Sequence, residues 1–212
     1  MSQLIVCRNK NGIVLAADSK ALEFVPPEKV MEVEVNRLLQ LNKQTAILAG
    51  GAVEGPQMCN KLKSFIEDEK LSDIDEIYRA ALPFLGSEYE MFMRKECETV
   101  PLDPLHHVHF ILAGLSATEP ENPYRLYLLW TKKKLPQLDG DEIGLAYTVP
   151  RRMGLEYKLN QLCKDNSQLK EILPTIRETM EQLGRKEEEV GPPYTYAFIS
   201  EEGFKAVDQL AS

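Results

Sequence analysis

The sequence predicts an α+β domain in which two β-sheets are packed between two layers of helices, a four-layer αββα sandwich. Three observations support this fold class. The chain has 212 residues, of which 43% are hydrophobic, enough to bury a full core in one domain over residues 1–212. It opens with two apolar runs joined by Asn11-Gly12, a strong hairpin signal. The later apolar patterns follow the order strands, paired helices, strands, paired helices and strands, which suits two sheets covered by helices.

The predicted hairpin begins almost at the N-terminus. Its strands are expected over Leu4–Arg8 and Ile13–Asp18. Asn-Gly suits the tight turn because both residues tolerate a positive φ. The antiparallel second strand returns to the start of the first, so we expect the carboxylate of Asp18 to lie near Ser2.

Further strands are predicted from apolar runs and from period-two alternation of apolar and polar residues. The segment that contains Pro26-Pro27 is expected to be a loop, and Gly140 is expected to mark a turn. The predicted strands are Met31–Val35 continuing through Arg37–Leu41, then Thr45–Ala49, His107–Leu115, Tyr124–Trp130, Ile143–Val149, Tyr194–Ser200 and Phe204–Val207.

Apolar residues at helical spacing predict four helices. Pro83 is expected to bend or break the second helix, because proline lacks an amide hydrogen and clashes with the preceding turn. Gly184 is expected to end the fourth helix. The first helix is expected to begin near Ala52, and the others to span about Asp73–Glu96, Arg151–Lys164 and Gln168–Leu183.

The composition argues against several classes of function. A net charge of −8 gives no support to nucleic-acid binding, which needs a basic face, and it argues against docking on anionic lipid. No apolar run approaches the roughly 20 residues that span a bilayer, and the start of the chain lacks a signal-peptide pattern. We therefore expect a cytoplasmic protein with no nucleic-acid or membrane partner. Four scattered cysteines, expected to be reduced, are Cys7, Cys59, Cys97 and Cys163.

Three segments in the first quarter of the chain resemble a known family. They read GIVLAADSKA at Gly12–Ala21, NRLLQLN at Asn36–Asn42 and AILAGGAVEG at Ala46–Gly55. In this order and spacing they are similar to the opening of a proteasome β-type subunit, a member of the N-terminal nucleophile (Ntn) hydrolases. The resemblance implies the αββα fold of Ntn hydrolases and peptide-bond hydrolysis of the threonine-protease type in protein catabolism. It also implies peptide or unfolded-protein substrates, a homo-oligomeric ring, a possible ATPase unfoldase partner and no cofactor.

The resemblance places the nucleophile at Ser2, which is exposed when Met1 is removed. A small residue after methionine generally permits that removal. The free α-amine, whose unperturbed pKa is about 7.7–8.0, can then take the hydroxyl proton while Oγ attacks a peptide carbonyl. The family uses threonine, exposed by cleavage of a propeptide that is not expected here. Serine lacks the methyl group that restrains the rotamer, so slower chemistry is expected.

Three further residues match the family's site. Asp18 corresponds to the aspartate that orients the basic partner and the amine, and Gly50 to the glycine whose amide supplies the oxyanion hole. Arg37 falls where the family carries a lysine that lowers the pKa of the amine. Arginine keeps the positive charge but cannot shuttle a proton. Three lysines could compensate, and nothing in their spacing selects among Lys20, Lys29 and Lys43.

The second half of the chain departs from the family pattern. The stretch DEIGLAYTV at 141–149 lacks the serine that supports the nucleophile. Glu188-Glu189 stand where the family has an aspartate, and a glutamate could substitute, but Pro192-Pro193 occupy the following turn. Two alternatives stay open. One is a catalytically inactive structural or binding subunit with Arg37 fixed on Asp18, and the other is a specific amidase or transpeptidase.

The chain's three histidines stand at 106, 107 and 109. On a strand, His107 and His109 share one face, an arrangement that can bind a transition metal. No carboxylate or cysteine at ligand spacing completes the set, so no metal site is expected.

Overall fold

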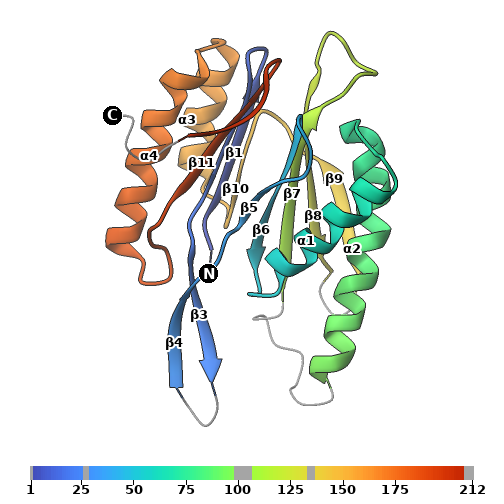
Figure 1. Ribbon diagram of the computed structural model, residues 1–212. Helices are drawn as coiled ribbons and strands as arrows, with labels where there is room; N and C mark the ends of the chain where they lie inside the picture. The colour runs from blue at the N-terminus through green and yellow to red at the C-terminus, as the bar shows by residue number, and fades with distance from the viewer. Residues whose placement is uncertain (1, 26–28, 98–106, 133–136, 208–212) are drawn as a thin grey trace.

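The computed structural model describes residues 2–25, 29–97, 107–132 and 137–207, with the backbone alone for 22–25, 29–30 and 96–97. These ranges contain twelve strands and four helices (Figure 1). The strands are β1 (Leu4–Asn9), β2 (Gly12–Ala17), β3 (Lys20–Val25), β4 (Lys29–Glu34), β5 (Leu38–Gln40), β6 (Thr45–Gly51), β7 (Val108–Leu115), β8 (Tyr124–Thr131), β9 (Leu138–Glu142), β10 (Ala146–Val149), β11 (Thr195–Ser200) and β12 (Gly203–Val207). The helices are α1 (Gly55–Asp68), α2 (Ile74–Cys97), α3 (Met153–Lys164) and α4 (Leu169–Lys186).

The strands pair into three antiparallel sheets. One five-stranded sheet has the order β10-β1-β2-β11-β12 and the other the order β5-β6-β7-β8-β9, while β3 and β4 form a two-stranded hairpin. This hairpin extends away from the rest of the molecule (Figure 1). Because β1 pairs with both β2 and β10, the strand that follows Ser2 lies inside its sheet and not at an edge.

Helices cover the outer faces of the two five-stranded sheets, which face one another across the centre of the molecule (Figure 1). Side chains of β1 alternate between two cores: Leu4 and Val6 pack between the sheets, whereas Ile5 and Cys7 pack on the side of α3 and α4. A third core lies between α1, α2 and the second sheet. A strand buried on both faces is apolar throughout, as the first part of β1 is. The α+β class expected from the sequence is confirmed.

The predicted N-terminal hairpin is also confirmed. Asn9 lies opposite Gly12, and Leu4 lies opposite Ala17. Gly12 has a φ of +138°, a backbone conformation that favours glycine because it has no Cβ. Beyond the paired strands, the Asp18 amide donates to the Gln3 carbonyl at 3.2 Å. The hairpin thereby brings Asp18 to the residue that follows Ser2.

Two expectations about the following segment are wrong. The stretch Lys20–Val25, expected to be a loop, forms β3 and pairs with β4, and the proline pair that indicated a loop comes only after it. Residues 31–41 do not form one continuous strand, since β4 ends at Glu34 and β5 begins at Leu38 in a different sheet. Arg37 lies in the link between them and is only 2% exposed.

Two glycines that were expected to end elements lie inside them. Gly140 is within β9, where a Cβ atom would lie 2.7 Å from Tyr78 Oη. Gly184 is within α4, where a Cβ atom would lie 2.1 Å from Tyr194 Oη. Each glycine therefore makes room for a tyrosine from another segment, Tyr78 of α2 or Tyr194 directly before β11, a close approach that only the tertiary structure creates.

Other expectations shift only in detail. Helix α1 begins at Gly55 and not near Ala52, and α2 continues past Pro83 without ending there. The closing hairpin of β11 and β12 is confirmed. Three cysteines are free and buried, as expected, namely Cys7, Cys59 and Cys163, while the side chain of Cys97 lies outside the described residues.

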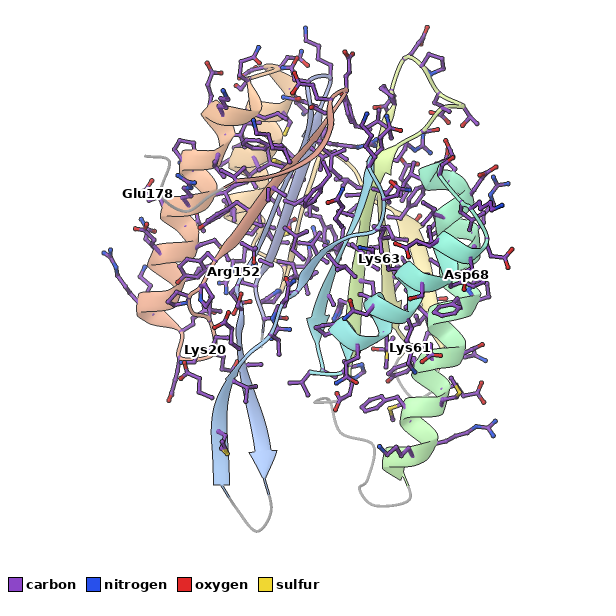
Figure 2. All side chains as sticks on the ribbon, viewed as in Figure 1. Lys20, Lys61, Lys63, Asp68, Arg152 and Glu178 are labelled. Carbon is purple, nitrogen blue, oxygen red and sulfur yellow. The ribbon has the colours of Figure 1, made fainter. Side chains whose placement is uncertain are left out.

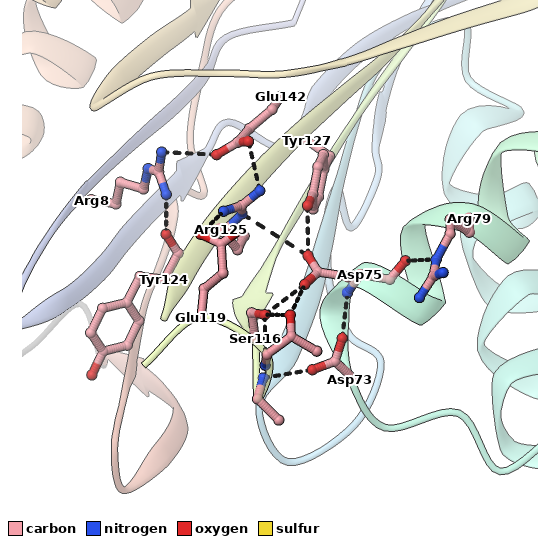
Figure 3. A network of polar contacts seen from close by, with 12 residues as sticks. Arg8, Asp73, Asp75, Arg79, Ser116, Glu119, Tyr124, Arg125, Tyr127 and Glu142 are labelled. Carbon is pink, nitrogen blue, oxygen red and sulfur yellow. Dashed lines mark hydrogen bonds and ion pairs between the residues drawn. The ribbon is translucent and has the colours of Figure 1, made fainter. Parts of the chain in front are cut away.

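A polar network joins the two large sheets at one end (Figure 3). Asp75 at the start of α2 accepts a hydrogen bond from Tyr127 Oη at 2.6 Å. Glu142 on β9 accepts hydrogen bonds from Arg125 on β8 at 2.7 Å and from Arg8 on β1 at 3.1 Å. Arg8 belongs to the first sheet and Glu142 to the second, so the network ties the sheets together at the end of β1 that is distant from the N-terminus.

Candidate active site

The candidate site lies where the chain enters β1 and β6 ends. Ser2 is 3% exposed, and its Oγ accepts a hydrogen bond from the Gly51 amide at 2.9 Å. A Cβ atom on Gly50 would lie only 2.9 Å from the same oxygen. The glycine pair therefore leaves space for the hydroxyl and supplies a donor to it. The Gly50 amide was the expected donor in the site, whereas the amide that contacts Ser2 belongs to Gly51. Met1 lies outside the described residues.

Asp18 is fixed to the residue that follows Ser2. Its side chain is fully buried, and Oδ1 accepts a hydrogen bond from the Gln3 amide at 2.8 Å. Burial raises the pKa of the Asp18 carboxyl, while the Gln3 amide, the Arg37 charge and the Gly191 amide act in the opposite direction and only partly offset it. Asp18 is therefore a buried carboxylate that is held beside Gln3 by the backbone of the hairpin.

Arg37 is the cation that faces Asp18. Its Nε lies 3.6 Å from Asp18 Oδ1, and its Nη2 donates to the Lys20 carbonyl at 3.0 Å. Burial lowers the pKa of Arg37, and the charge of Asp18 raises it. Among the described residues, neither Arg37 Nε, Arg37 Nη1 nor Asp18 Oδ2 has a hydrogen-bond partner. The two ions thus share a buried space without forming a tight pair.

The lysines considered as substitutes for Arg37 do not contact Asp18 in the described part of the chain. Lys20 forms an ion pair with Glu32 at 2.9 Å and lies at the start of the β3–β4 hairpin (Figure 2). The Lys43 carbonyl accepts the Phe204 amide at 2.7 Å, at the turn into β12. The side chain of Lys29 lies outside the described residues.

A buried side-chain bridge supports the start of β1 from the other direction. Gln3 is fully buried, and its Oε1 accepts a hydrogen bond from Arg152 Nε. Arg152 Nη2 also binds Glu187 Oε2 at 2.6 Å, and Figure 2 shows Arg152 in the region between α4 and the strands. From the sequence, Glu188 or Glu189 was the expected acidic residue in support of the nucleophile. The carboxylate that reaches the N-terminal strand through Arg152 is that of Glu187.

A pocket of about 260 Å³ opens beside Ser2. It is lined by Ser2 and Gly51, by His107 and His109 at the start of β7, and by residues 147–151 at the end of β10. Both histidines line this pocket, but β7 begins at Val108, so only His109 lies on the strand on which both were expected. His107 Nδ1 lies 2.6 Å from Thr131 Oγ1, whereas His109 Nδ1 is buried without a hydrogen-bond partner among the described residues. His106 lies outside the described residues.

Glu156 of α3 binds two residues that line the pocket, Thr148 and Arg151. The Glu156 side chain is 4% exposed and accepts hydrogen bonds from the Thr148 amide at 3.0 Å and the Thr148 hydroxyl at 2.7 Å. It also accepts from Arg151 Nε at 2.8 Å and Nη2 at 2.6 Å. Burial raises the pKa of Glu156, but the bonds from Arg151 and Thr148 outweigh this and lower it overall. Thr148 itself lines the pocket, and its hydroxyl is held by this bond to Glu156.

Gln3, Arg152 and Glu187 are among the residues of this site that the sequence did not indicate. They lie far apart in the chain, and no local pattern marks them. Gln3, as a polar residue directly before the apolar run of β1, offered the only signal that could have found them.

No protein-family model matches the chain, and no curated protein is similar to it at a significant level. In the described ranges, no group of three or more histidine, cysteine, aspartate or glutamate residues is arranged to hold a metal ion. None of the described helices is both long enough and apolar enough to cross a membrane.

Proposed function

We propose that this chain is a proteasome β-like Ntn hydrolase in which Ser2 attacks peptide bonds of peptides or unfolded proteins. The observation that carries the proposal is the position of Ser2 Oγ. It lies on a glycine pair, bonded to the Gly51 amide at 2.9 Å, at the edge of a pocket. The adjoining residue, Gln3, is held by buried Asp18. The order of helix pair, sheet, sheet and helix pair supports the αββα fold of this class.

The chemistry needs a proton acceptor for the Ser2 hydroxyl. With Met1 removed, the α-amine of Ser2 is that acceptor, and its unperturbed pKa of about 7.7–8.0 leaves a useful neutral fraction at cellular pH. Oγ attacks the carbonyl carbon, the amine of the product leaves, and water releases the acyl group from Ser2. Asp18 and Arg37 fix the start of β1 and set the local charge. No cofactor takes part.

Partners and location follow from the same proposal. A ring of identical chains would enclose the sites, an ATPase unfoldase would deliver substrates, and the protein would work in the cytoplasm. These features rest on the resemblance of residues 12–55 to the opening of proteasome β-type subunits.

A second candidate function is a catalytically inactive binding subunit of the same fold. Two observations favour it. Ser2 is only 3% exposed, and a buried arginine, 3.6 Å from Asp18, stands in place of the lysine that can exchange protons. An amidase or transpeptidase would use the same acyl-enzyme and differ in substrate and acceptor.

The deciding experiment is the intact mass of the purified protein before and after treatment with a β-lactone probe, with Ser2→Ala as control. The proposal expects a species without Met1 and one probe adduct that is absent from Ser2→Ala. A protein that retains Met1 entirely and never reacts, or an adduct that persists in Ser2→Ala, would favour the inactive subunit.

A further inference from the structure

His109 is a second basic group close to the Ser2 hydroxyl. In the pairing of β6 with β7, His109 lies directly opposite Gly50. Side chains of directly opposite residues project from the same face, with Cβ atoms about 4.5–5.5 Å apart. On Gly50 that direction leads to Ser2, because a Cβ atom there would lie 2.9 Å from Ser2 Oγ. The imidazole of His109 therefore starts one strand away from the nucleophile and extends from the same face of the sheet.

The surroundings of His109 leave its ring available. His109 and Ser2 line the same pocket of about 260 Å³, and His109 Nδ1 has no hydrogen-bond partner among the described residues. His107, by contrast, is bound to Thr131 at 2.6 Å. Burial and the neighbouring His107 lower the pKa of His109, which keeps its ring neutral and able to accept a proton at neutral pH. The other charged or titratable groups of the pocket are Tyr147 and Arg151.

We propose that His109 accepts the hydroxyl proton of Ser2, so that Ser2 can be acylated whether or not its α-amine is free. This inference rests on the proposed function of Ser2 as the nucleophile. It differs from that function in the identity of the base, and it removes the requirement for a free N-terminus.

The proton and electron movements balance without an added reagent. The Ser2 hydroxyl proton passes to a nitrogen of His109 as Oγ bonds to the carbonyl carbon and the carbonyl electron pair moves onto oxygen. The electron pair on that oxygen then re-forms the carbonyl, the carbon–nitrogen bond breaks, and the imidazolium proton passes to the leaving amine. In the second half, His109 takes a proton from water, the water oxygen bonds to the same carbon, and Ser2 leaves with the proton restored to Oγ.

The test compares two forms of the full-length protein by intact mass during reaction with a β-lactone probe. One form has Ser2 at its N-terminus. In the other, one added lysine follows Met1, which prevents removal of the methionine and keeps the α-amine away from Ser2. The proposal expects adducts on both forms, at rates within about tenfold of each other. It also expects His109→Gln to slow labelling of the blocked form by about a hundredfold or more, the usual contribution of a general base.

Imidazole rescue separates a chemical role of His109 from a structural one. Added imidazole should restore labelling of His109→Ala in the blocked form, and His107→Gln should lose less activity than His109→Gln. Labelling of the free form alone would overturn the His109 proposal and leave the Ser2 nucleophile in place. Unchanged labelling in His109→Gln, or no rescue by imidazole in a folded His109→Ala, would also overturn it. No labelling of Ser2 in either form would overturn both proposals.

Discussion

Arg37 Nε and Asp18 Oδ1 lie 3.6 Å apart in a buried site and share no hydrogen bond. Arg37 is 2% exposed and Asp18 is fully buried, so both charges have lost their hydration. The mutual attraction of such a pair stabilises the fold less than that of a pair with direct hydrogen bonds. Its main role is that each charge offsets the cost of burying the other. The consequences of removing one partner therefore differ from those of removing both.

Arg37→Met should lower the free energy of unfolding by about 3–5 kcal/mol at neutral pH, because it leaves the Asp18 carboxylate buried without a counter-charge. The double variant Arg37→Met with Asp18→Asn should recover most of that loss, because no buried charge remains. Urea denaturation of the wild type, both single variants and the double variant measures the coupling. An Arg37→Met protein as stable as the wild type would contradict this account of the pair.

Glu156→Gln should make the free energy of unfolding depend less on pH in the acidic range. The pKa of Glu156 is below its ordinary value of 4.5 in the folded state. Its contribution is therefore fully present above that value and is lost as the pH falls through the folded-state pKa. We expect the wild type to be more stable than Glu156→Gln by about 2 kcal/mol at pH 7, and this difference to shrink below about pH 4.5.

Urea unfolding at a series of pH values checks that expectation. Glu178→Gln is the matched control, because the exposed Glu178 side chain on α4 accepts a hydrogen bond from Gln182 at 3.1 Å. A difference between wild type and Glu156→Gln that stays constant between pH 7 and pH 3 would contradict the assigned role of Glu156.

Gly51→Ala should destabilise the fold and Gly86→Ala should not. Gly51 has a φ of +91°, and a Cβ atom there would lie 2.0 Å from the His107 carbonyl oxygen. The backbone strain alone costs about 1–3 kcal/mol, and the clash adds to it. Gly86 lies in α2 with open space around its Cβ position, so alanine there should stabilise by about 0.5–1 kcal/mol. Thermal unfolding of both variants measures the contrast, and equal shifts of the two melting temperatures would refute this prediction.

Arg152→Met should mainly slow the labelling of Ser2 by the β-lactone probe and have a smaller effect on the free energy of unfolding. Arg152 holds the Gln3 side chain next to Ser2 and binds Glu187, so its loss loosens the nucleophile. A displacement of about 1 Å can cost a factor of the order of a hundred in rate, and we expect a loss of ten- to a hundredfold. Arg185→Met is the control, because Arg185 forms an exposed ion pair with Glu181 at 3.7 Å. Equal labelling rates in the two variants would show that the bridge does not position Ser2.

Much of the fold could be predicted because its signals are local. The Asn11-Gly12 turn specifies its own backbone conformation, and alternating or helical apolar patterns identify most strands and all four helices. The approach of Asp18 to the start of the chain follows from hairpin geometry alone. Where prediction failed, as at Gly140 and Gly184, a glycine whose local sequence indicates a break accommodates a tyrosine from another segment of the chain.

The sequence by itself determined the α+β class and the N-terminal hairpin that brings Asp18 to the start of the chain, since both depend on neighbours close in the chain. Ser2 and Arg37 became candidates only through the resemblance to a family. Only the tertiary structure decided which groups surround Ser2. Three features of the site depend on which strands and helices pack together. They are the bridge from Gln3 to Arg152, the contact of Ser2 with Gly51 and the position of His109 opposite Gly50. That choice is made by burial of apolar faces over the whole chain, and no local spacing of polar residues records it.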